Sequence, residues 1–128
     1  MQSVPGYNAV EEIAKGRQSA FKVMEECCDV GVAFRHPVLG HISLLYGDRN
    51  SGVRHILSRR EREIADQPSL VGQIPSEVVF KLIEVVILGK LTRAGAKCLM
   101  EYDGYRAILG APQGNQMNYW LISGYKLT

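Results

Sequence analysis

The sequence predicts an α+β protein in which N-terminal helices pack on an antiparallel β-sheet of about four strands. Two observations lead to this fold class. In the earlier part of the chain, apolar residues recur every three or four positions, which is the spacing of amphipathic helices. In the later part, the pattern changes to strand-like alternation around Asp103-Gly104, a dipeptide that favours a two-residue hairpin. Neither repeats nor low-complexity segments interrupt this order.

The composition is that of one globular domain, which we expect to span residues 1–128. Hydrophobic residues make up 46% and charged residues 22%, and no apolar run approaches the roughly 20 residues that cross a bilayer. We therefore expect neither disorder nor a membrane protein. Three cysteines do not make an even disulfide framework, which favours a reducing compartment. The net charge of +2 is too small to indicate nucleic-acid binding without local clustering.

The N-terminal part predicts one long amphipathic helix. Residues 1–8 form a loose lead-in that ends at Asn8, a residue type that caps helices, and the helix covers about residues 9–27. Gly16 weakens the middle of this segment, so two shorter helices remain an alternative. The expected apolar stripe comprises Val10, Ile13, Ala14, Phe21 and Met24.

Two extended segments follow this helix. Residues 30–36 form a brief strand or an extended connector that Pro37 ends, and we expect His36 on the surface. Residues 41–46 are rich in apolar side chains and short enough for a buried strand. The turn-forming residues 47–52 end this second segment.

Two further helices come next. Asn50 or Ser51 caps the first, a loop over residues 66–75 separates the two, and Ser76 caps the second, which ends at Gly89 in a left-handed conformation. Both helices carry apolar stripes at helical spacing. The stripe of the first comprises Val53, Ile56, Leu57 and Ile64, and that of the second comprises Val79, Leu82, Ile83, Val86 and Ile87.

The last part of the chain predicts a three-stranded antiparallel meander. Residues 97–102 and 105–110 flank the hairpin turn, residues 112–116 form a second turn, and residues 117–126 form the third strand. The hairpin turn sets the register, with the pairs Tyr102/Tyr105, Glu101/Arg106, Met100/Ala107 and Cys98/Leu109. Alternation in the third strand places Tyr119, Leu121, Ser123 and Tyr125 on one face and Trp120, Ile122 and Gly124 on the other.

A basic cluster in the central helix is the best chemical clue. It comprises Arg54, Arg59, Arg60 and Arg62, and Glu61 and Glu63 dilute it. His55 and Arg59 are four residues apart, so one helical face presents a titratable imidazole and a permanent cation that can meet one phosphate. The alternative is a solvated helix face with ordinary salt bridges and a structural histidine.

The sequence offers no convincing metal site. His36 and His41 lie on either side of a proline, and the acidic residues are scattered. His41 begins the central strand and stays a spare acid or base candidate, with a structural role at the strand end as the alternative.

Three short stretches carry a resemblance: residues 40–47 (GHISLLYG), 52–60 (GVRHILSRR) and 118–126 (NYWLISGYK). They resemble the barnase/EndoU/colicin/RelE group of nucleases, in particular its members in phage proteins and bacterial polymorphic toxins. The match covers about residues 9–126. The resemblance implies helices that precede a curved antiparallel sheet carrying the active site.

The same resemblance implies a metal-independent endoribonuclease that needs no cofactor. It cleaves cellular RNA, with transfer RNA among the candidates, by transesterification to a 2′,3′-cyclic phosphate. The family pattern of a helical histidine, a nearby cation and a last-strand hydroxyl and tyrosine falls on His55, Arg59, Ser123 and Tyr125. Arg54, Arg60 and Arg106 are the candidates for binding substrate.

Some assignments within this pattern stay open. Arg60 competes with Arg59 for the place that faces the cleft, and Arg106 can equally form a surface salt bridge with Glu101. Relatives are expected to carry a second histidine or a lysine where this chain has Arg59 or Arg60, which leaves open which residue is the acid and which the base. They also tend to have threonine in place of Ser123, a change that retains the hydroxyl.

The resemblance also implies a toxin domain that acts in the cytoplasm of a bacterial target cell and has a cognate immunity protein. The N-terminus lacks a basic-then-apolar signal pattern, so we expect any export to use another part of a larger polypeptide. Delivery within a larger secreted toxin or phage protein is what the resemblance implies. Two other functions stay open. One is a noncatalytic nucleic-acid-binding module whose arginine-rich helix contacts phosphates, and the other is an inert interaction domain on the same fold.

Overall fold

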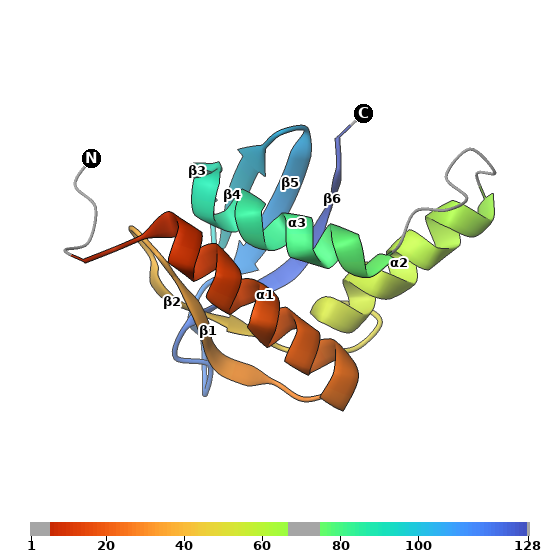
Figure 1. The fold of residues 1–128 in the computed structure, drawn as a ribbon, viewed down its shortest axis with the longest axis horizontal. Helices are drawn as coiled ribbons and strands as arrows, with labels where there is room; N and C mark the ends of the chain where they lie inside the picture. Colours follow the sequence, from red (N-terminus) through yellow and green to blue (C-terminus); the bar gives the residue numbers. More distant parts are fainter. Residues whose placement is uncertain (1–5, 67–74, 128) are drawn as a thin grey trace.

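The computed structural model describes residues 6–66 and 75–127, and this part of the chain forms three helices and six strands (Figure 1). The helices are α1 (Ala9–Glu26), α2 (Val53–Asp66) and α3 (Pro75–Leu88). The strands are β1 (Val30–His36), β2 (Gly40–Leu44), β3 (Lys90–Ala94), β4 (Lys97–Tyr102), β5 (Tyr105–Gly110) and β6 (Tyr119–Lys126).

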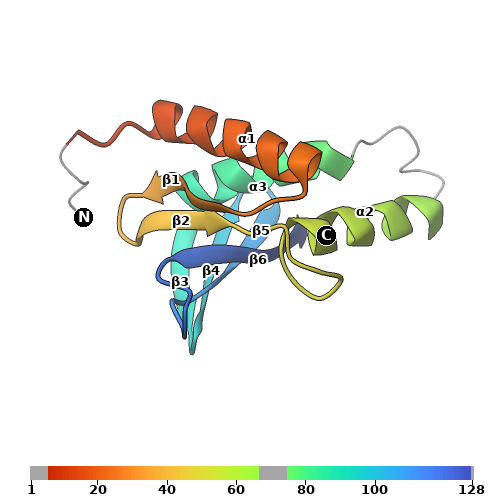
Figure 2. The same ribbon diagram turned by 90° about the horizontal axis from the view of Figure 1, so that it is seen from below.

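The strands form one open mixed sheet in the order β1-β2-β6-β5-β4-β3. Neighbouring strands are antiparallel except β2 and β6, which are parallel. α1 and α3 lie on the same side of the sheet, and α2 extends outward beside the end of β6 (Figure 2). The α+β class is confirmed, whereas the predicted antiparallel sheet of about four strands is wrong.

The two edge strands and the parallel pairing account for this difference. The segment 30–36 is a strand, β1, and not a connector. β3 follows α3 directly and is mostly exposed, so its residues show no apolar alternation that would predict a strand. Gly95, with φ of 64°, occupies the first central position of the β3–β4 turn, as a type II′ hairpin requires. The β2–β6 pairing joins distant segments, for which no local sequence signal exists.

The β4–β5 hairpin matches its prediction in turn and register. Asp103 and Gly104 have φ of 51° and 79°, which are the positive values of a type I′ turn. All four predicted cross-strand pairs are present, and β5 and β6 are antiparallel as expected. The pairs with Cys98 and Met100 bury their side chains beneath α3, whose predicted stripe is also buried in full. Local turn chemistry and alternation therefore suffice for this part of the core.

A β-bulge at Ile122 changes the predicted faces of β6. Ser123 lies opposite Ile108, whereas Leu121 lies opposite Leu109, so Ile122 is an extra residue in the ladder. Leu121 therefore faces the core together with Gly124, and Ser123 and Tyr125 lie on the opposite face. The prediction that Leu121 shares a face with Ser123 is wrong, because uninterrupted alternation does not hold across a bulge.

α1 is one continuous helix that buries a face different from the predicted one. Asn8 caps it as expected, and its side-chain oxygen accepts a hydrogen bond from Glu11 N–H at 3.2 Å. Val10 and Phe21 are 77% and 57% exposed. The buried residues are Glu12, Gly16, Ala20 and Val23. Ile13 and Met24 of the predicted stripe are partly buried against the core, but the fully buried positions include a charge and a glycine, so the apolar pattern places the centre of the buried face wrongly.

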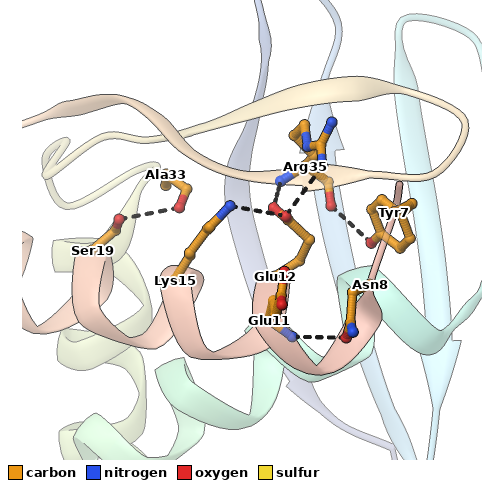
Figure 3. A network of polar contacts seen from close by, with 8 residues as sticks. All are labelled: Tyr7, Asn8, Glu11, Glu12, Lys15, Ser19, Ala33 and Arg35. Carbon is orange, nitrogen blue, oxygen red and sulfur yellow. Dashed lines mark hydrogen bonds and ion pairs between the residues drawn. The ribbon is translucent and has the colours of Figure 1, made fainter. Parts of the chain in front are cut away.

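Glu12 is buried because it binds the free edge of β1 (Figure 3). Its Oε1 accepts a hydrogen bond from the backbone N–H of Arg35 at 2.7 Å, and its Oε2 accepts one from Lys15 Nζ at 3.3 Å. Burial by itself raises the pKa of Glu12, but the Arg35 N–H and the charges of Lys15 and Arg35 outweigh it and hold this pKa below its ordinary value. A carboxylate inside the molecule is therefore compensated by hydrogen bonds and by positive charge.

Tyr7 and Ser19 complete the attachment of α1 to β1 (Figure 3). Tyr7 donates to the Arg35 carbonyl at 2.8 Å, and Ser19 donates to the Ala33 carbonyl at 3.2 Å. Burial, together with the negative charge of Glu12, raises the pKa of Tyr7 to about 12. Side chains from the α1 region thus occupy backbone groups that an edge strand otherwise leaves open for pairing.

The predicted ends of α3 need correction. Ser76 is not the cap, because the helix already begins at Pro75, a residue favoured at the first helical position. Gly89 follows the helix as expected but does not have a positive φ. An added Cβ at Gly89 would overlap the Val85 carbonyl oxygen and would lie 3.1 Å from the backbone N and O of Glu101, so the last turn of α3 and the close approach of β4 together explain the glycine. The predicted 66–75 loop lies almost entirely outside the described residues.

Replacing Gly16 with alanine is expected to destabilise the protein, because the new methyl group overpacks the α1–α3 contact, which costs about 1–3 kcal/mol. A Cβ at this position would overlap Ile83 Cγ2, which is stiff, and would lie 3.0 Å from Phe34 Cδ1. The alanine gain in helix propensity is only about 1 kcal/mol and does not offset this. Urea unfolding followed by circular dichroism measures the difference.

Gly31→Ala is the control for that measurement. Nothing lies within 4 Å of a Cβ added at Gly31, so its free energy of unfolding should change by no more than about 0.5 kcal/mol. A Gly16→Ala protein as stable as the wild type would contradict the close packing of α1 on α3.

Candidate functional site

Backbone contacts of the loop before α2 set the position of this helix. Val53 N–H donates to the Leu45 carbonyl at 3.0 Å, and Arg54 N–H donates to the Tyr46 carbonyl at 2.9 Å. The first donors of the helix are therefore satisfied by the main chain that leaves β2. The prediction that Asn50 or Ser51 caps α2 is wrong, since the helix begins after Gly52.

The bulge in β6 provides a further anchor for α2. Gly52 N–H donates to the Ile122 carbonyl at 2.8 Å, and this carbonyl belongs to the extra residue of the ladder. Gly52 has φ of 93°, and a Cβ there would lie 2.9 Å from the Leu45 carbonyl oxygen. Only glycine fits this conformation and this approach. The start of α2 and the strand that carries Ser123 and Tyr125 are thus joined directly.

Tyr125 lies close to two arginines at this junction. The Arg59 guanidinium carbon is 4.6 Å from the centre of the Tyr125 ring, and that of Arg106 is 5.9 Å from it. Arg106 Nη1 also donates to the Tyr125 hydroxyl at 3.0 Å. We call Arg59, Arg106 and Tyr125 the arginine–tyrosine cluster. It unites a residue of α2 with residues of β5 and β6, and guanidinium groups of this kind are common ligands of phosphate in proteins.

Each arginine of the cluster also has a carboxylate partner. Arg106 donates twice to Glu101 Oε2, at 3.1 and 2.8 Å, in the cross-strand pair predicted as the alternative role for Arg106. Arg59 Nε donates to Glu63 at 3.3 Å. The hydrogen bond to Glu101, and to a lesser extent that to Tyr125, raises the pKa of Arg106 above its ordinary value. Arg106 is therefore charged at every physiological pH.

His55 lies in a neighbouring hollow. Its Nδ1 is 2.7 Å from the Arg49 carbonyl, and because a carbonyl only accepts, Nδ1 carries the proton and Nε2 is the free nitrogen. The hollow is open, has a volume of about 750 Å³, and is lined by Arg49, Asn50, His55, Ser58, Glu61 and Arg62. Such an imidazole is oriented, partly exposed and available for proton transfer.

The predicted site residues thus fall into three groups. Arg59 and Tyr125 are in contact, with Arg106 beside them. His55 lies one helical turn from Arg59, but neither Ser123 nor Tyr125 lines its hollow. Ser123 shares a face with Tyr125 and is only 7% exposed.

The other two arginines proposed to bind substrate differ sharply in exposure. Arg54 is exposed, whereas Arg60 is buried and pairs with Glu63 at 2.9 Å. Of the two arginines left open by the sequence, Arg59 is therefore the one at the tyrosine. The predicted apolar stripe of α2 is buried at Val53 and Ile56 and partly buried at Leu57. The side chain of Ile64, the fourth residue of this stripe, is not among those that the structure describes.

Two residues that sequence reasoning did not assign also shape the site. Glu63 contacts both Arg59 and Arg60, and its position four residues after Arg59 is a signal available in the sequence. Arg49 orients His55 through its carbonyl, and no sequence pattern points to that contact because it depends on the conformation of the loop.

The remaining histidines are not part of this site. His36 was expected on the surface but is buried, and its Nδ1 accepts hydrogen bonds from Val38 N–H at 3.0 Å and Leu39 N–H at 3.1 Å. Burial lowers the pKa of His36 to about 4. It therefore holds the β1–β2 turn as a neutral imidazole. His41 lies exposed on β2.

Metal ligands and membrane helices were sought in the described ranges as well. Within residues 6–66 and 75–127, no three His, Cys, Asp or Glu side chains gather as a metal site would require. None of the helices in the same ranges combines the length and the apolar character needed to cross a membrane.

Comparison with known proteins adds no relative. No protein-family model, curated protein or solved structure matches the chain. The functional interpretation therefore depends on the residues and their geometry.

Replacing His36 with asparagine is expected to flatten the pH dependence of stability. Because folding lowers the pKa of His36 from 6.5 to about 4, its contribution is complete above pH 6.5 and is lost as the pH falls towards 4. The wild type should therefore lose about 1–2 kcal/mol more than the variant between about pH 7 and pH 5. Urea unfolding at both pH values gives the comparison.

His41→Asn serves as the control because it replaces an exposed histidine. It should keep the wild-type pH dependence. Equal slopes for the wild type and His36→Asn would show that protonation of His36 is not coupled to unfolding.

Proposed function

We propose that this protein is a metal-independent endoribonuclease whose site lies where α2 meets β6. The observation that carries the proposal is the contact of Arg59 with Tyr125, beside Arg106 and one helical turn from His55. A phosphodiester needs cations for the charge that develops on its oxygens, and these residues supply two at one ring. The resemblance of residues 40–60 and 118–126 to a nuclease group points to the same chemistry.

Cleavage in this proposal uses the 2′-hydroxyl of RNA as the nucleophile. A base takes its proton, the 2′-oxygen bonds to phosphorus, and the 5′-oxygen leaves with a proton from an acid, which yields a 2′,3′-cyclic phosphate. His55 Nε2 is the proposed proton-transfer group, since Arg49 holds the other ring nitrogen. Arg59 and Arg106 hold the phosphate, and the Tyr125 and Ser123 hydroxyls are its hydrogen-bond donors.

The substrate and biological setting follow only from the resemblance. We propose cellular RNA as the substrate, with transfer RNA among the candidates, and an immunity protein as the partner that blocks the site. Delivery within a larger toxin or phage protein into a bacterial target cell is part of the same proposal.

The second candidate function is a noncatalytic RNA-binding module. The position of His55 favours it, because the hollow of His55 is lined by neither Tyr125 nor Ser123. In that case the arginines contact phosphates and no proton transfer takes place.

Wild-type protein incubated with total RNA in excess EDTA is expected to give defined fragments with cyclic-phosphate ends. Replacing His55 with alanine should lower the cleavage rate by about 10²–10⁴-fold, because proton transfer is lost, while RNA affinity is retained. Sequencing of the fragment ends and a gel-shift titration measure the two properties. His41→Ala, which removes an exposed histidine, is the control and should cleave at the wild-type rate.

Intact RNA that still shifts on the gel would instead support the binding module. Cleavage by His55→Ala at the wild-type rate would remove His55 from the mechanism.

Replacing Arg59 with alanine should weaken both cleavage and RNA binding, because one cation of the cluster is lost. The salt dependence of binding should also become shallower, since one fewer counterion is released. Affinity measured at two salt concentrations tests this. Arg17→Ala, which removes a half-exposed arginine on α1, controls for net charge, and an equal effect of both variants would contradict a specific role for Arg59.

A further inference from the structure

The Glu63 carboxylate lies between two successive arginines of α2. Its Oε1 accepts a hydrogen bond from Arg59 Nε at 3.3 Å, and its Oε2 accepts one from Arg60 Nη1 at 2.9 Å. Each oxygen thus binds one guanidinium, which is how two arginines hold a phosphate through two of its oxygens. Arg59 at the same time lies against the Tyr125 ring of the proposed site.

Arg60 is a buried cation whose hydrogen bonding is incomplete. The residue is 8% exposed, and its Nε is buried without a partner in the part of the chain that the structure describes. A buried guanidinium ordinarily has its donors satisfied, because a buried and unpaired donor costs free energy. Arg60 also lines a cavity together with Arg59, Glu63 and Tyr125.

This cavity is too small for a phosphate while Glu63 is in place. Its volume is about 10 Å³, which is close to the space that one water molecule needs. The Glu63 side chain is 34% exposed, so it can turn towards solvent. An anion that enters must therefore replace the carboxylate.

We propose that Arg59 and Arg60 form a subsite for an RNA phosphate and that Glu63 occupies it as an internal competitor. This proposal rests on the proposed function in one respect, namely that the ligand is RNA. The phosphodiester exchanges with a partly exposed carboxylate, a contact that solvent already weakens. Glu63 thus lowers RNA affinity and at the same time compensates the charge of buried Arg60 in the free protein.

The test compares the wild type with Glu63→Gln. The probe is a short, fluorescently labelled oligoribonucleotide with 2′-O-methyl groups, which lacks the free 2′-hydroxyl needed for cleavage. Glutamine keeps the size of the side chain and an oxygen acceptor but removes the charge. We expect Glu63→Gln to bind the probe about two- to fivefold more tightly than the wild type, with a steeper salt dependence.

Two further variants make the test specific. Glu77→Gln removes the same charge from an exposed position on α3 and should change affinity much less. In the Arg59→Gln background the gain from Glu63→Gln should shrink, because one of the two competing cations is absent. Circular dichroism and thermal unfolding confirm that each variant is folded.

Two results would overturn the proposal. In the first, Glu63→Gln binds the probe no better than Glu77→Gln does, so only net charge matters. In the second, Glu63→Gln binds more weakly than the wild type, so Glu63 holds the arginines for the ligand. Failure of the proposed function is seen separately, as absence of cleavage of unmodified RNA, because the modified probe reports binding alone.

Discussion

The parallel pairing of β2 with β6 is the contact on which the rest of the structure depends. It joins the β1–β2 hairpin to the β6-β5-β4-β3 part of the sheet through the pairs Ile42/Tyr119 and Ser43/Trp120. Immediately beyond it, Gly52 N–H binds the carbonyl of the bulged residue Ile122. This one junction therefore continues the sheet and also fixes where α2 begins, so that Arg59 reaches Tyr125.

Local sequence signals predict the elements well and their long-range arrangement poorly. Asp103-Gly104 specifies its turn and thereby a whole hairpin register, because both effects act between neighbours in the chain. The buried face of α1 does not follow from local signals in this way. Glu12 and Gly16 point inward because β1 and α3 contact them there. The bulge at Ile122 likewise satisfies a partner, Gly52, that lies far away in the sequence.

The residues of the candidate site show the same difference between local signals and long-range arrangement. The spacing of His55 and Arg59 places them on one side of α2, as the helical period requires. Whether either residue meets the last strand depends on the packing of α2 against β6, and only Arg59 does so through Tyr125. The choice between Arg59 and Arg60 depends on the rotation of the helix about its axis, which places Arg59 against the Tyr125 ring and leaves Arg60 buried beside Glu63.

Pairing with carboxylates explains how a site for an anion can exist in a chain with a net charge of only +2. Arg106 pairs with Glu101, and Glu63 is shared by Arg59 and Arg60, so two carboxylates offset two of the three arginine charges at this site in the free protein. Solvent-exposed ion pairs contribute about 0–1 kcal/mol each, so exchange of one carboxylate partner for another anion costs little free energy. A count of charge over the whole sequence therefore does not reveal such a site, and in the proposed function a phosphate takes the place of a carboxylate beside the arginines.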